Sequence, residues 1–411
     1  MTTYTEISQC RICGGADLRH ILSLGRQALT GVFPKSPADH VTHGPLDLVW
    51  CAGCGLLQLK QSYDAAEMYG QNYGYRSGLN QSMVKHLENK IHQLEERYAP
   101  VAGDTVIDIG SNDATSLKAY RSRCRRVGID PTGDKFRRFY NDDITLIPDF
   151  FSADVLRRAL PGAKAKIITA IAMFYDLESP QQFAREIADV LAADGIWHFE
   201  QSYMPSMLKA NSYDTICHEH LEFYSFTVVK KLLADCGLRV IDVETNAVNG
   251  GSFAVTACLA AAPHQANDRT IAAMLADEDA LGLGTEKPYR DFAQRVFAHR
   301  ERLKELLAAL RAAGKTVLGY GASTKGNVLL QFCGLGQEDI PCIADVNPDK
   351  YGCCTPGTHI PIVSEAEAHA MPPDYFLVLP WHFRDAILER EQAYLAAGGK
   401  MIFPLPDITI V

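Results

Sequence analysis

Two glycine-rich stretches decide the fold: Val106-Ile107-Asp108-Ile109-Gly110-Ser111-Asn112-Asp113 and Val317-Leu318-Gly319-Tyr320-Gly321-Ala322-Ser323-Thr324-Lys325-Gly326. Each is an apolar run that breaks at glycine and continues into a helical pattern. In open α/β sheets, such strand-to-helix junctions form the crevices that bind nucleotides. Two crevices in one chain predict two nucleotide-like ligands and a group that moves between them.

Strand-like and helix-like segments alternate around these junctions. We expect strands at 106–109, 126–129, 166–170, 196–200, 238–243, 253–258, 316–320, 342–345, 375–379 and 400–402. Helices are expected at 116–123, 180–191 and 228–236, and a long charged helical segment at 266–313. The alternation predicts the α/β class with mainly parallel, doubly wound sheets.

Four of the twelve cysteines form two CxxC pairs, Cys10-Arg11-Ile12-Cys13 and Cys51-Ala52-Gly53-Cys54. A CxxC turn can direct two thiolates at one ion. The two turns therefore predict a structural Zn²⁺ held by Cys10, Cys13, Cys51 and Cys54. Two unrelated cysteine pairs are the alternative. A redox pair is disfavoured because neither pair opens a helix after a strand.

Charge and hydropathy restrict the partners. The formal net charge of −9 gives no general affinity for nucleic acid or anionic membranes. No apolar stretch has the roughly 20 residues that span a bilayer, and no basic segment followed by an apolar one opens the chain. We therefore expect a cytoplasmic protein that binds neither nucleic acid nor membrane, as a monomer or a weak homodimer.

The first crevice has the residues of an S-adenosylmethionine site. Asp108 lies inside the strand, and one glycine, Gly110, stands where a nicotinamide-dinucleotide fingerprint has three. Asp130 ends the next strand, where a carboxylate can accept both ribose hydroxyls, and Asp113 is expected to hold the methionine ammonium. The expected cofactor-binding residues are Asp108, Gly110, Asn112, Asp113, Asp130, Phe150 and Ala172. A Rossmann domain for another nucleotide is the alternative.

The segment from Tyr213 to Ser225 is dense in proton-transfer groups and contains His218-Glu219-His220. The two histidines are two residues apart, so no helix presents both to one metal, and the HExxH pattern is absent. A neutral histidine suits the role of general base for a carbon acid beside a carbonyl, and a glutamate can fix its tautomer. A solvated loop with chance histidines is the alternative.

Taken together and in order, these motifs resemble a known family. The two CxxC pairs, Ile-Gly-Ser-Asn-Asp, His-Glu-His-Leu, Asn249–Ser252 and Gly319–Asn327 are similar to those of the sugar C-methyltransferases, which make branched deoxysugars on a nucleotide carrier. The resemblance covers essentially the whole chain. It implies a zinc-binding N-terminal domain, a central methyltransferase domain and a C-terminal Rossmann-like domain, with a 4-keto nucleotide sugar between the last two.

The resemblance also implies roles for single residues. The histidine that matches His220 is the base that removes a proton beside the ketone, and the resulting enolate attacks the methyl group. Glu219 and a tyrosine within Tyr73–Tyr75 support that site. The expected catalytic residues are therefore His220, Glu219, Tyr75, Cys217 and His218. This chain departs from the family at Cys217, where tyrosine is common, and at Ala114, where glycine is common.

In the second crevice, Gly319, Gly321 and Gly326 leave room for a diphosphate at a helix N-terminus. The expected substrate-binding residues are Tyr73, Tyr224, Asn249, Gly321, Ser323, Thr324, Lys325, Asn327, Asp345 and His382. Thymidine and guanosine diphosphates both remain open as the carrier. A tight turn in a structural Rossmann domain is the alternative.

The expected domains are a zinc-binding module at 1–65, a Rossmann-like class I methyltransferase domain at 66–262, a helical connector at 263–313 and a nucleotide-sugar-binding Rossmann-like domain at 314–411. The predicted reaction moves a methyl group from S-adenosylmethionine to a carbon next to the ketone of a 4-keto nucleotide-linked deoxysugar. The alternatives are an O- or N-methyltransferase acting on a small metabolite or nucleotide sugar, and an NAD-dependent sugar enzyme. A zinc-containing RNA-binding protein is disfavoured by the acidic charge.

Overall fold

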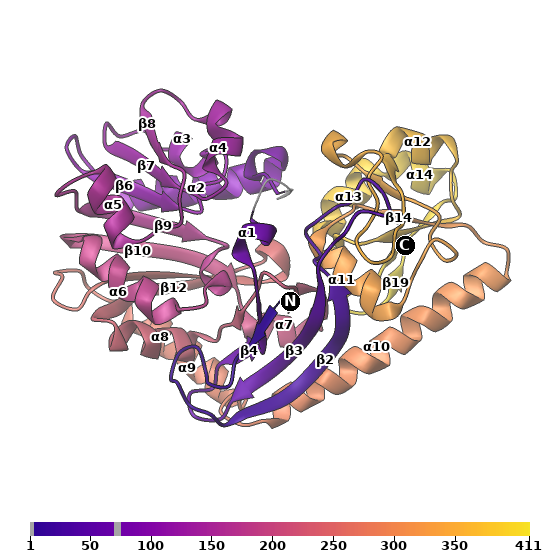
Figure 1. Ribbon diagram of the computed structural model, residues 1–411, viewed down its shortest axis with the longest axis horizontal. Helices are drawn as coiled ribbons and strands as arrows, with labels where there is room; N and C mark the ends of the chain where they lie inside the picture. Colours follow the sequence, from indigo (N-terminus) through magenta and orange to yellow (C-terminus); the bar gives the residue numbers. More distant parts are fainter. Residues whose placement is uncertain (1–3, 70–74) are drawn as a thin grey trace.

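The computed structural model describes residues 4–69 and 75–411. Figure 1 shows two α/β units side by side, joined at one end by strands of the N-terminal segment and by a long helix. The expected α/β class, with a small N-terminal module and two Rossmann-like sheets, is confirmed.

The central sheet has seven strands in the order β12-β13-β10-β9-β6-β7-β8. Its bounds are β6 Thr105–Ile109, β7 Arg125–Ile129, β8 Ile144–Ile147, β9 Ala165–Ile171, β10 Leu191–Ser202, β12 Leu238–Asn246 and β13 Ser252–Leu259. Strands β6 to β10 pair in parallel, whereas β13 is antiparallel to both β10 and β12. All five residues of β6 are buried, as expected for a parallel strand covered on both faces.

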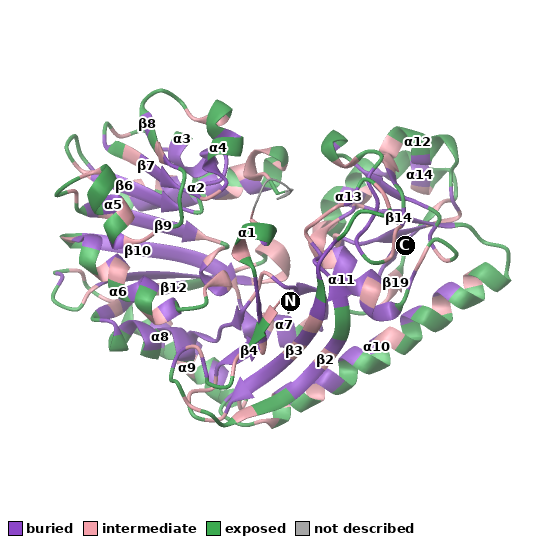
Figure 2. Ribbon diagram, viewed as in Figure 1, coloured by how far each residue is buried: buried purple, intermediate pink, exposed green. Residues whose placement is uncertain are grey.

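Helices cover both faces of this sheet. Side chains of α5 Ala153–Ala159, α6 Pro180–Val190 and α8 Phe226–Asp235 pack in one apolar cluster, and those of α2 Gln81–Tyr98 and α3 Thr115–Lys118 pack in another. The short helix α4 Gly133–Phe136 follows β7. Figure 2 shows the buried strands between these partly exposed helices.

The C-terminal sheet has six strands in the order β16-β15-β14-β17-β18-β19, of which only β19 is antiparallel. The strands are β14 Val317–Tyr320, β15 Ile343–Asp345, β16 Ile362–Ser364, β17 Tyr375–Val378, β18 Lys400–Phe403 and β19 Thr409–Ile410. The helices are α11 Thr324–Cys333, α12 Glu365–Ala370, α13 Arg384–Arg390 and α14 Gln392–Ala396. Strand β14 therefore runs into α11 at the second glycine-rich junction.

The N-terminal segment forms a curved four-stranded sheet in the order β11-β4-β3-β2, beside a two-stranded pair of β1 Tyr4–Glu6 and β5 Gln61–Tyr63. The four strands are β2 Leu18–Ala28, β3 His43–Cys51, β4 Leu57–Leu59 and β11 Glu222–Phe223. Helix α1 Ala65–Met68 follows, and α7 Met204–Lys209 lies after β10. The last strand, β11, comes from the segment that follows His218-Glu219-His220.

One apolar cluster joins the N-terminal sheet to the C-terminal unit. Buried residues of β2 and β3 pack with α10 Lys287–Ala312 and with the C-terminal sheet. The rings of Trp50 on β3 and Tyr289 on α10, for example, have centroids 5.6 Å apart. This shared core fixes the N-terminal sheet against the second α/β unit (Figure 1).

Two expected elements differ from the structure. The helix expected at 116–123 ends at Lys118, because the N–H groups of Arg121 and Ser122 donate to the Glu95 carboxylate instead of continuing the helix. The long helical segment is two helices, α9 Asp268–Ala280 and α10, separated at Gly282 with φ +71°. Within the described ranges, no helix is both long and apolar enough to cross a membrane.

Candidate active site

Four thiol groups meet in the N-terminal segment. The Sγ atoms of Cys10, Cys13, Cys51 and Cys54 all lie within 4.8 Å of one another. The Cys10–Cys54 distance is 3.6 Å and the Cys13–Cys51 distance is 3.5 Å. Tetrahedral zinc with Zn–S bonds of about 2.3 Å separates its thiolates by about 3.8 Å, so this cluster fits a structural Zn²⁺.

Arg11, between the first two cysteines, ties this cluster to the segment that carries His220. Its side chain is only 3% exposed, donates to the carbonyl oxygens of Leu59 and Gln61, and lies 3.8 Å from the Glu222 carboxylate. Glu222 begins β11, which pairs antiparallel with β4. The cysteine cluster and the histidine segment therefore share one sheet.

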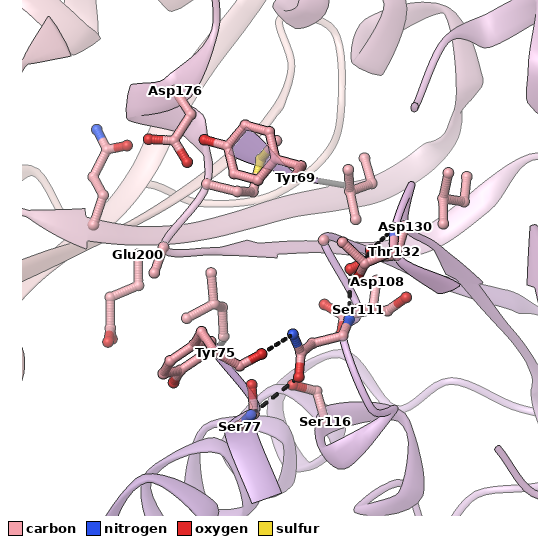
Figure 3. Close-up of a pocket in the computed structure, with 18 of the residues that line it drawn as sticks. Tyr69, Tyr75, Ser77, Asp108, Ser111, Ser116, Asp130, Thr132, Asp176 and Glu200 are labelled. Atoms are coloured by element: carbon pink, nitrogen blue, oxygen red, sulfur yellow. Dashed lines mark hydrogen bonds between the residues drawn. The ribbon is translucent and has the colours of Figure 1, made fainter. Parts of the chain in front are cut away.

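A cavity of about 310 Å³ opens at the carboxyl ends of the central strands. Its lining includes the acids Asp108, Asp130, Asp176 and Glu200. Many of its other residues lie at the ends of β6, β7, β9 and β10 or in the segments after β6, β7 and β9. Figure 3 shows these side chains around the cavity. Ligands of open α/β folds bind at this edge of the sheet.

Asp108 lies on β6, and Asp130 directly follows the neighbouring strand β7. Asp108 Oδ1 accepts a hydrogen bond of 2.5 Å from the hydroxyl of Thr169, and burial raises the pKa of Asp108 to about 7. The Asp130 carboxylate accepts the N–H groups of Asn112 at 2.7 Å and Thr132 at 2.6 Å. Asp130 therefore shapes the glycine loop and also lines the cavity.

Asn112 and Asp113 hold the segment Tyr75–Gly78 at the cavity. The Asn112 side chain accepts the N–H of Ser77 at 3.0 Å and donates to the Tyr75 carbonyl at 3.3 Å. Dashed lines in Figure 3 mark these two bonds at Ser77 and Tyr75. Asp113 Oδ2 accepts the N–H of Gly78 at 3.0 Å. Asp113 therefore anchors this segment beside the cavity, and its contact with a methionine ammonium stays a prediction.

The backbone of the cavity wall is left-handed at several lining residues, which include Gly110, Asn112, Ala172 and Asn249. Gly110 has φ +72°, and a Cβ there would lie 3.3 Å from Met173 Cγ. Ala172 has φ +56°, and its N–H donates to the Glu200 carbonyl at 2.7 Å. A left-handed residue other than glycine costs about 1–2 kcal/mol, and such strain gathers at functional sites. Phe150, half exposed, also lines the cavity.

His220 is held in one tautomer. Its Nδ1 lies 2.7 Å from the carbonyl oxygen of Thr215 in the turn η4 Tyr213–Thr215. Because a carbonyl oxygen only accepts, Nδ1 carries the proton and Nε2 keeps its lone pair. The imidazole packs against the ring of Tyr175 at 4.3 Å, and burial, with the Lys325 charge, lowers the pKa of His220 to about 4.

The other expected residues of this segment face elsewhere. His218 is fully buried, and its ring packs edge-on against Tyr63 at 4.7 Å. Glu219 is directed to the backbone at Gly31, where an added Cβ would lie 2.6 Å from its Oε1. Cys217 is 1% exposed and neighbours Glu219. The Thr215 carbonyl, rather than Glu219, fixes the His220 tautomer.

The second crevice repeats the geometry of the first. At the end of β14, the N–H of Ala322 donates to Asp345 Oδ2 at 2.8 Å, and Asp345 Oδ1 accepts the N–H of Asn347 at 2.7 Å. Asp130 holds Asn112 and Thr132 in the same way in the first crevice.

A glycine with positive φ follows the strand at each of the two strand-to-helix junctions. Gly321 has φ +79° and donates to the Ala344 carbonyl at 2.7 Å, as Gly110 donates to Ile129 at 2.8 Å. A Cβ at Gly321 would lie 2.6 Å from Pro380, so only glycine fits there.

Lys325, Asn249 and Trp381 connect the two α/β units near His220. Lys325 Nζ donates to the Asn249 carbonyl at 2.9 Å, and Asn249 also lines the cofactor cavity. Trp381 Nε1 donates to Asp214 Oδ2 at 2.8 Å, next to Thr215. Burial, together with the nearby Lys325 charge, lowers the pKa of His382 to about 3.

The remaining expected substrate residues are more scattered. Ser323 caps α11 by accepting the N–H of Gly326 at 3.0 Å, and its neighbour Thr324 lies near Gly31. Asn327 is fully buried and donates to the Thr30 carbonyl. Tyr224 is buried in the methyltransferase core, Tyr75 is half exposed at the cavity, and Tyr73 lies outside the described residues.

Comparison with known proteins decides the family. A family model for a zinc binding domain matches residues 10–69, one for a methyltransferase domain matches residues 83–243, and one for the C-methyltransferase C-terminal domain matches residues 247–406. The C-methyltransferase NovU of Streptomyces niveus is 34% identical over 409 residues, which is 98% of this chain and 97% of that protein. The chain belongs to the C-methyltransferase family.

Solved structures resemble part of this C-methyltransferase. An S-adenosylmethionine-dependent methyltransferase from Clostridium acetobutylicum is 10% identical, with 43% of this chain and 92% of that chain covered and a TM-score of 0.34. The magnesium protoporphyrin IX methyltransferase of Synechocystis, solved with S-adenosylhomocysteine, is 13% identical, with 46% and 90% covered and a TM-score of 0.33.

The C-methyltransferase therefore uses S-adenosylmethionine and carries a structural zinc. The strand-end acids, the glycine turn and the cavity fit the nucleoside half of this cofactor, and the four clustered thiols fit the metal. The roles of single residues at these sites remain predictions.

Residues that the sequence patterns did not indicate also border the site. Asp176 and Glu200 line the C-methyltransferase cavity, and Glu200 lies 2.6 Å from His86 and 2.9 Å from Asn246. Tyr69 lines the same cavity beside Asp176 (Figure 3). The end of β10 was the only available signal for Glu200. Asp176 lies in the segment after β9, and nothing in the neighbouring sequence marked its carboxyl.

Asp130→Ala is expected to weaken S-adenosylmethionine binding about tenfold or more, because hydrogen bonds to charged groups contribute roughly 1.5–3 kcal/mol. Part of that loss comes from the freed N–H of Asn112. Calorimetric titration with S-adenosylhomocysteine measures the change. Asp134→Ala, which removes the same charge from an exposed carboxylate on α4, is the control and should leave the Kd unchanged. An unaltered Kd in Asp130→Ala would remove this residue from the cofactor site.

Proposed function

We propose that this C-methyltransferase methylates a carbon next to the ketone of a nucleotide-linked 4-keto deoxysugar, with His220 as the general base. The observation that carries the proposal is the hydrogen bond from Nδ1 of His220 to the Thr215 carbonyl. It leaves the Nε2 lone pair free to take a proton from carbon. Methylation of carbon requires such a base, whereas methylation of oxygen or nitrogen needs little help of this kind.

The position of His220 supports a substrate that extends between the two crevices. The segment of His220 is hydrogen-bonded to the methyltransferase unit and to the N-terminal sheet. The N–H of Leu221 donates to the carbonyl of Tyr175 after β9, and the N–H of Leu59 on β4 donates to the Leu221 carbonyl. Lys325 contributes to the electrostatics of His220 from the C-terminal unit and donates to Asn249 of the cofactor cavity. We place the nucleotide in the C-terminal crevice, near Gly321 and Asp345, and the keto sugar beside His220.

The cofactor and the protein contribute different parts of the reaction. S-adenosylmethionine supplies an electrophilic methyl group. Nε2 of His220 takes the proton, and Tyr75 and Asn249 at the cavity border the sugar. Cys217 is only 1% exposed, so it replaces the family's usual tyrosine with a small, buried side chain.

Ligand screening by thermal shift tests the two-crevice proposal. A ligand that binds only the folded state raises Tm by mass action. We expect S-adenosylhomocysteine and either thymidine or guanosine diphosphate to raise Tm, separately and together, and NAD and short RNA to leave it unchanged. Stabilisation by NAD or RNA alone would favour the rival functions.

Sedimentation velocity on the same protein tests the expected monomer or weak dimer.

Solvent-deuterium exchange tests the base. With S-adenosylhomocysteine in place of the methyl donor, the enolate cannot be methylated and can only be reprotonated. When the proton on His220 exchanges with solvent before it returns, the carbon gains deuterium. Thymidine- and guanosine-diphosphate-linked 4-keto-6-deoxyhexoses in D₂O should therefore gain deuterium beside the ketone faster than without enzyme. His220→Asn should abolish this excess. Enzyme-independent exchange alone would contradict the proposed carbon acid chemistry.

The pH profile should show no acid limb at the ordinary histidine value. Burial and Lys325 lower the pKa of His220 to about 4, from 6.5, so the neutral base form persists as pH falls through 6.5. Activity that depends on this form is retained until pH approaches the lowered pKa. Measured over about pH 5 to 8, kcat/KM should therefore show no limb centred near 6.5. Such a limb would indicate an imidazole that is not buried in this way.

A further inference from the structure

Asp176 is a carboxylic acid in the cofactor cavity that the proposed reaction leaves without a role. It ends the turn η3 Phe174–Asp176, directly after β9 and the left-handed Ala172. Its Oδ1 is buried and has no hydrogen-bond partner among the residues that the structure describes. Tyr69 is its hydrogen-bonding neighbour, and Figure 3 shows the two side chains together at one end of the cavity. A buried, unsatisfied carboxyl oxygen is costly unless a ligand uses it.

Asp176 and His220 come from two backbone segments that are bonded to each other. The Tyr175 carbonyl accepts the N–H of Leu221 at 2.8 Å, so Asp176 and His220 each lie one residue from that bond. The Tyr175 ring also packs on the His220 ring. Both side chains are therefore fixed relative to one another by the same contact.

The surroundings of Asp176 favour its neutral, protonated form. Burial raises its pKa well above the ordinary range, and the neighbouring Glu219 charge raises it further. The hydrogen bond with Tyr69 lowers the pKa of Asp176, but its effect is smaller than that of burial. A neutral carboxylic acid can donate a hydrogen bond that a carboxylate cannot. The lowered pKa of His220, by contrast, favours its neutral, unprotonated form. When surroundings push two titratable groups apart in this way, one can donate a hydrogen bond while the other acts as base.

We propose that Asp176 donates a hydrogen bond to the ketone oxygen of the substrate and stabilises the enolate oxygen, a role that rests on the proposed function. As Nε2 of His220 takes the proton, the carbon–hydrogen pair forms the carbon–carbon double bond and the carbonyl pair moves to oxygen. When that carbon forms its bond to the methyl group, sulfur keeps the pair of the broken sulfur–methyl bond and the ketone re-forms. The Asp176 proton stays on Asp176 throughout, and His220 releases its proton to solvent.

Donors of this kind have large effects because the charge develops on one oxygen in a water-poor site. Loss of a single such donor typically lowers kcat about 10²- to 10³-fold. Asp176→Leu should therefore lower both kcat and the rate of deuterium exchange by about that factor. Asp176→Asn keeps a neutral N–H donor of the same shape, and it should retain kcat within about tenfold of the parent.

The pH profile separates this role from a structural one. In the parent, ionisation of Asp176 removes the donor, so kcat should fall along an alkaline limb. Asp176→Asn has no such ionisation and should lose that limb. The Kd for S-adenosylhomocysteine and Tm are measured for both variants, and both should stay near the parental values because the cofactor acids remain in place. Asp176→Asn is also the variant that keeps the test decisive if Asp176→Leu folds poorly.

The outcomes separate the two proposals. The donor role is overturned if Asp176→Leu keeps the parental kcat, or if Asp176→Asn is as impaired as Asp176→Leu. In either case, deuterium exchange by the parent would still support the His220 mechanism. Retention of the alkaline limb in Asp176→Asn also overturns the donor role. A parent that promotes no exchange on either keto sugar overturns the proposed function itself, and with it the role of Asp176.

Discussion

His220→Asn is expected to lower turnover about 10²- to 10⁴-fold, the range that a positioned general base contributes. Asparagine can still donate to the Thr215 carbonyl, so the loop keeps its anchor, but it offers no basic nitrogen in place of Nε2. The Kd values for S-adenosylhomocysteine and for the nucleotide diphosphate should stay at parental levels. Steady-state kinetics and calorimetry measure the two effects separately.

Thr215→Ala is the matched control for this variant. The backbone oxygen of Thr215 lies 2.7 Å from Nδ1, whereas its hydroxyl lies at 3.4 Å, so the acceptor survives the substitution. Near-parental turnover is expected. His218→Asn should act on stability and not on chemistry, because that ring is fully buried against Tyr63. Near-normal turnover in His220→Asn would refute the proposed base even though the family assignment stands.

Loss of one zinc ligand should be the most damaging change to the fold. Cys51→Ala is expected to express as mostly insoluble protein, with any soluble fraction melting on the order of 10 °C lower, because a structural metal contributes its binding free energy to folding. The damage should reach the active site, since Arg11 and the β4–β11 pairing connect the cysteine cluster to the His220 segment.

Elemental analysis tests this zinc account directly. The parent should contain one zinc per chain, and Cys51→Ala should contain little. Cys353→Ala removes a buried cysteine outside the cluster and should keep both the zinc and the solubility. Zinc-free parent protein with full stability would show that the four thiols do not need a metal.

Local patterns predicted most of the fold. The run Val106–Ile109 is buried throughout its strand, and glycine follows it because the turn at Gly110 has φ +72°. Both requirements act on neighbouring residues, so they are visible in the sequence. The paired cysteines are visible for the same reason, because each CxxC turn brings its own two ligands together.

The parts that could not be predicted depend on contacts between distant segments. The Asp113 carboxylate, for example, accepts the N–H of Gly78, which is 35 residues away in the sequence. Arg11 and Glu222 form their buried pair across the sheet that β11 completes, and Asp176 faces the cavity only because η3 pairs with the His220 segment. No spacing rule in one sequence indicates such pairings. A local departure, by contrast, has a simple structural reason. Ala114 has a φ of +61°, which explains why glycine suits that position.

The product itself tests the central claim most directly. The enzyme is incubated with ¹³C-methyl S-adenosylmethionine and uniformly ¹³C-labelled thymidine- or guanosine-diphosphate-linked 4-keto-6-deoxyhexose, and the product is examined by NMR. The account predicts a methyl carbon with a one-bond carbon–carbon coupling to the ring carbon next to the ketone. A methyl group attached through oxygen or nitrogen, and therefore without that coupling, would contradict it.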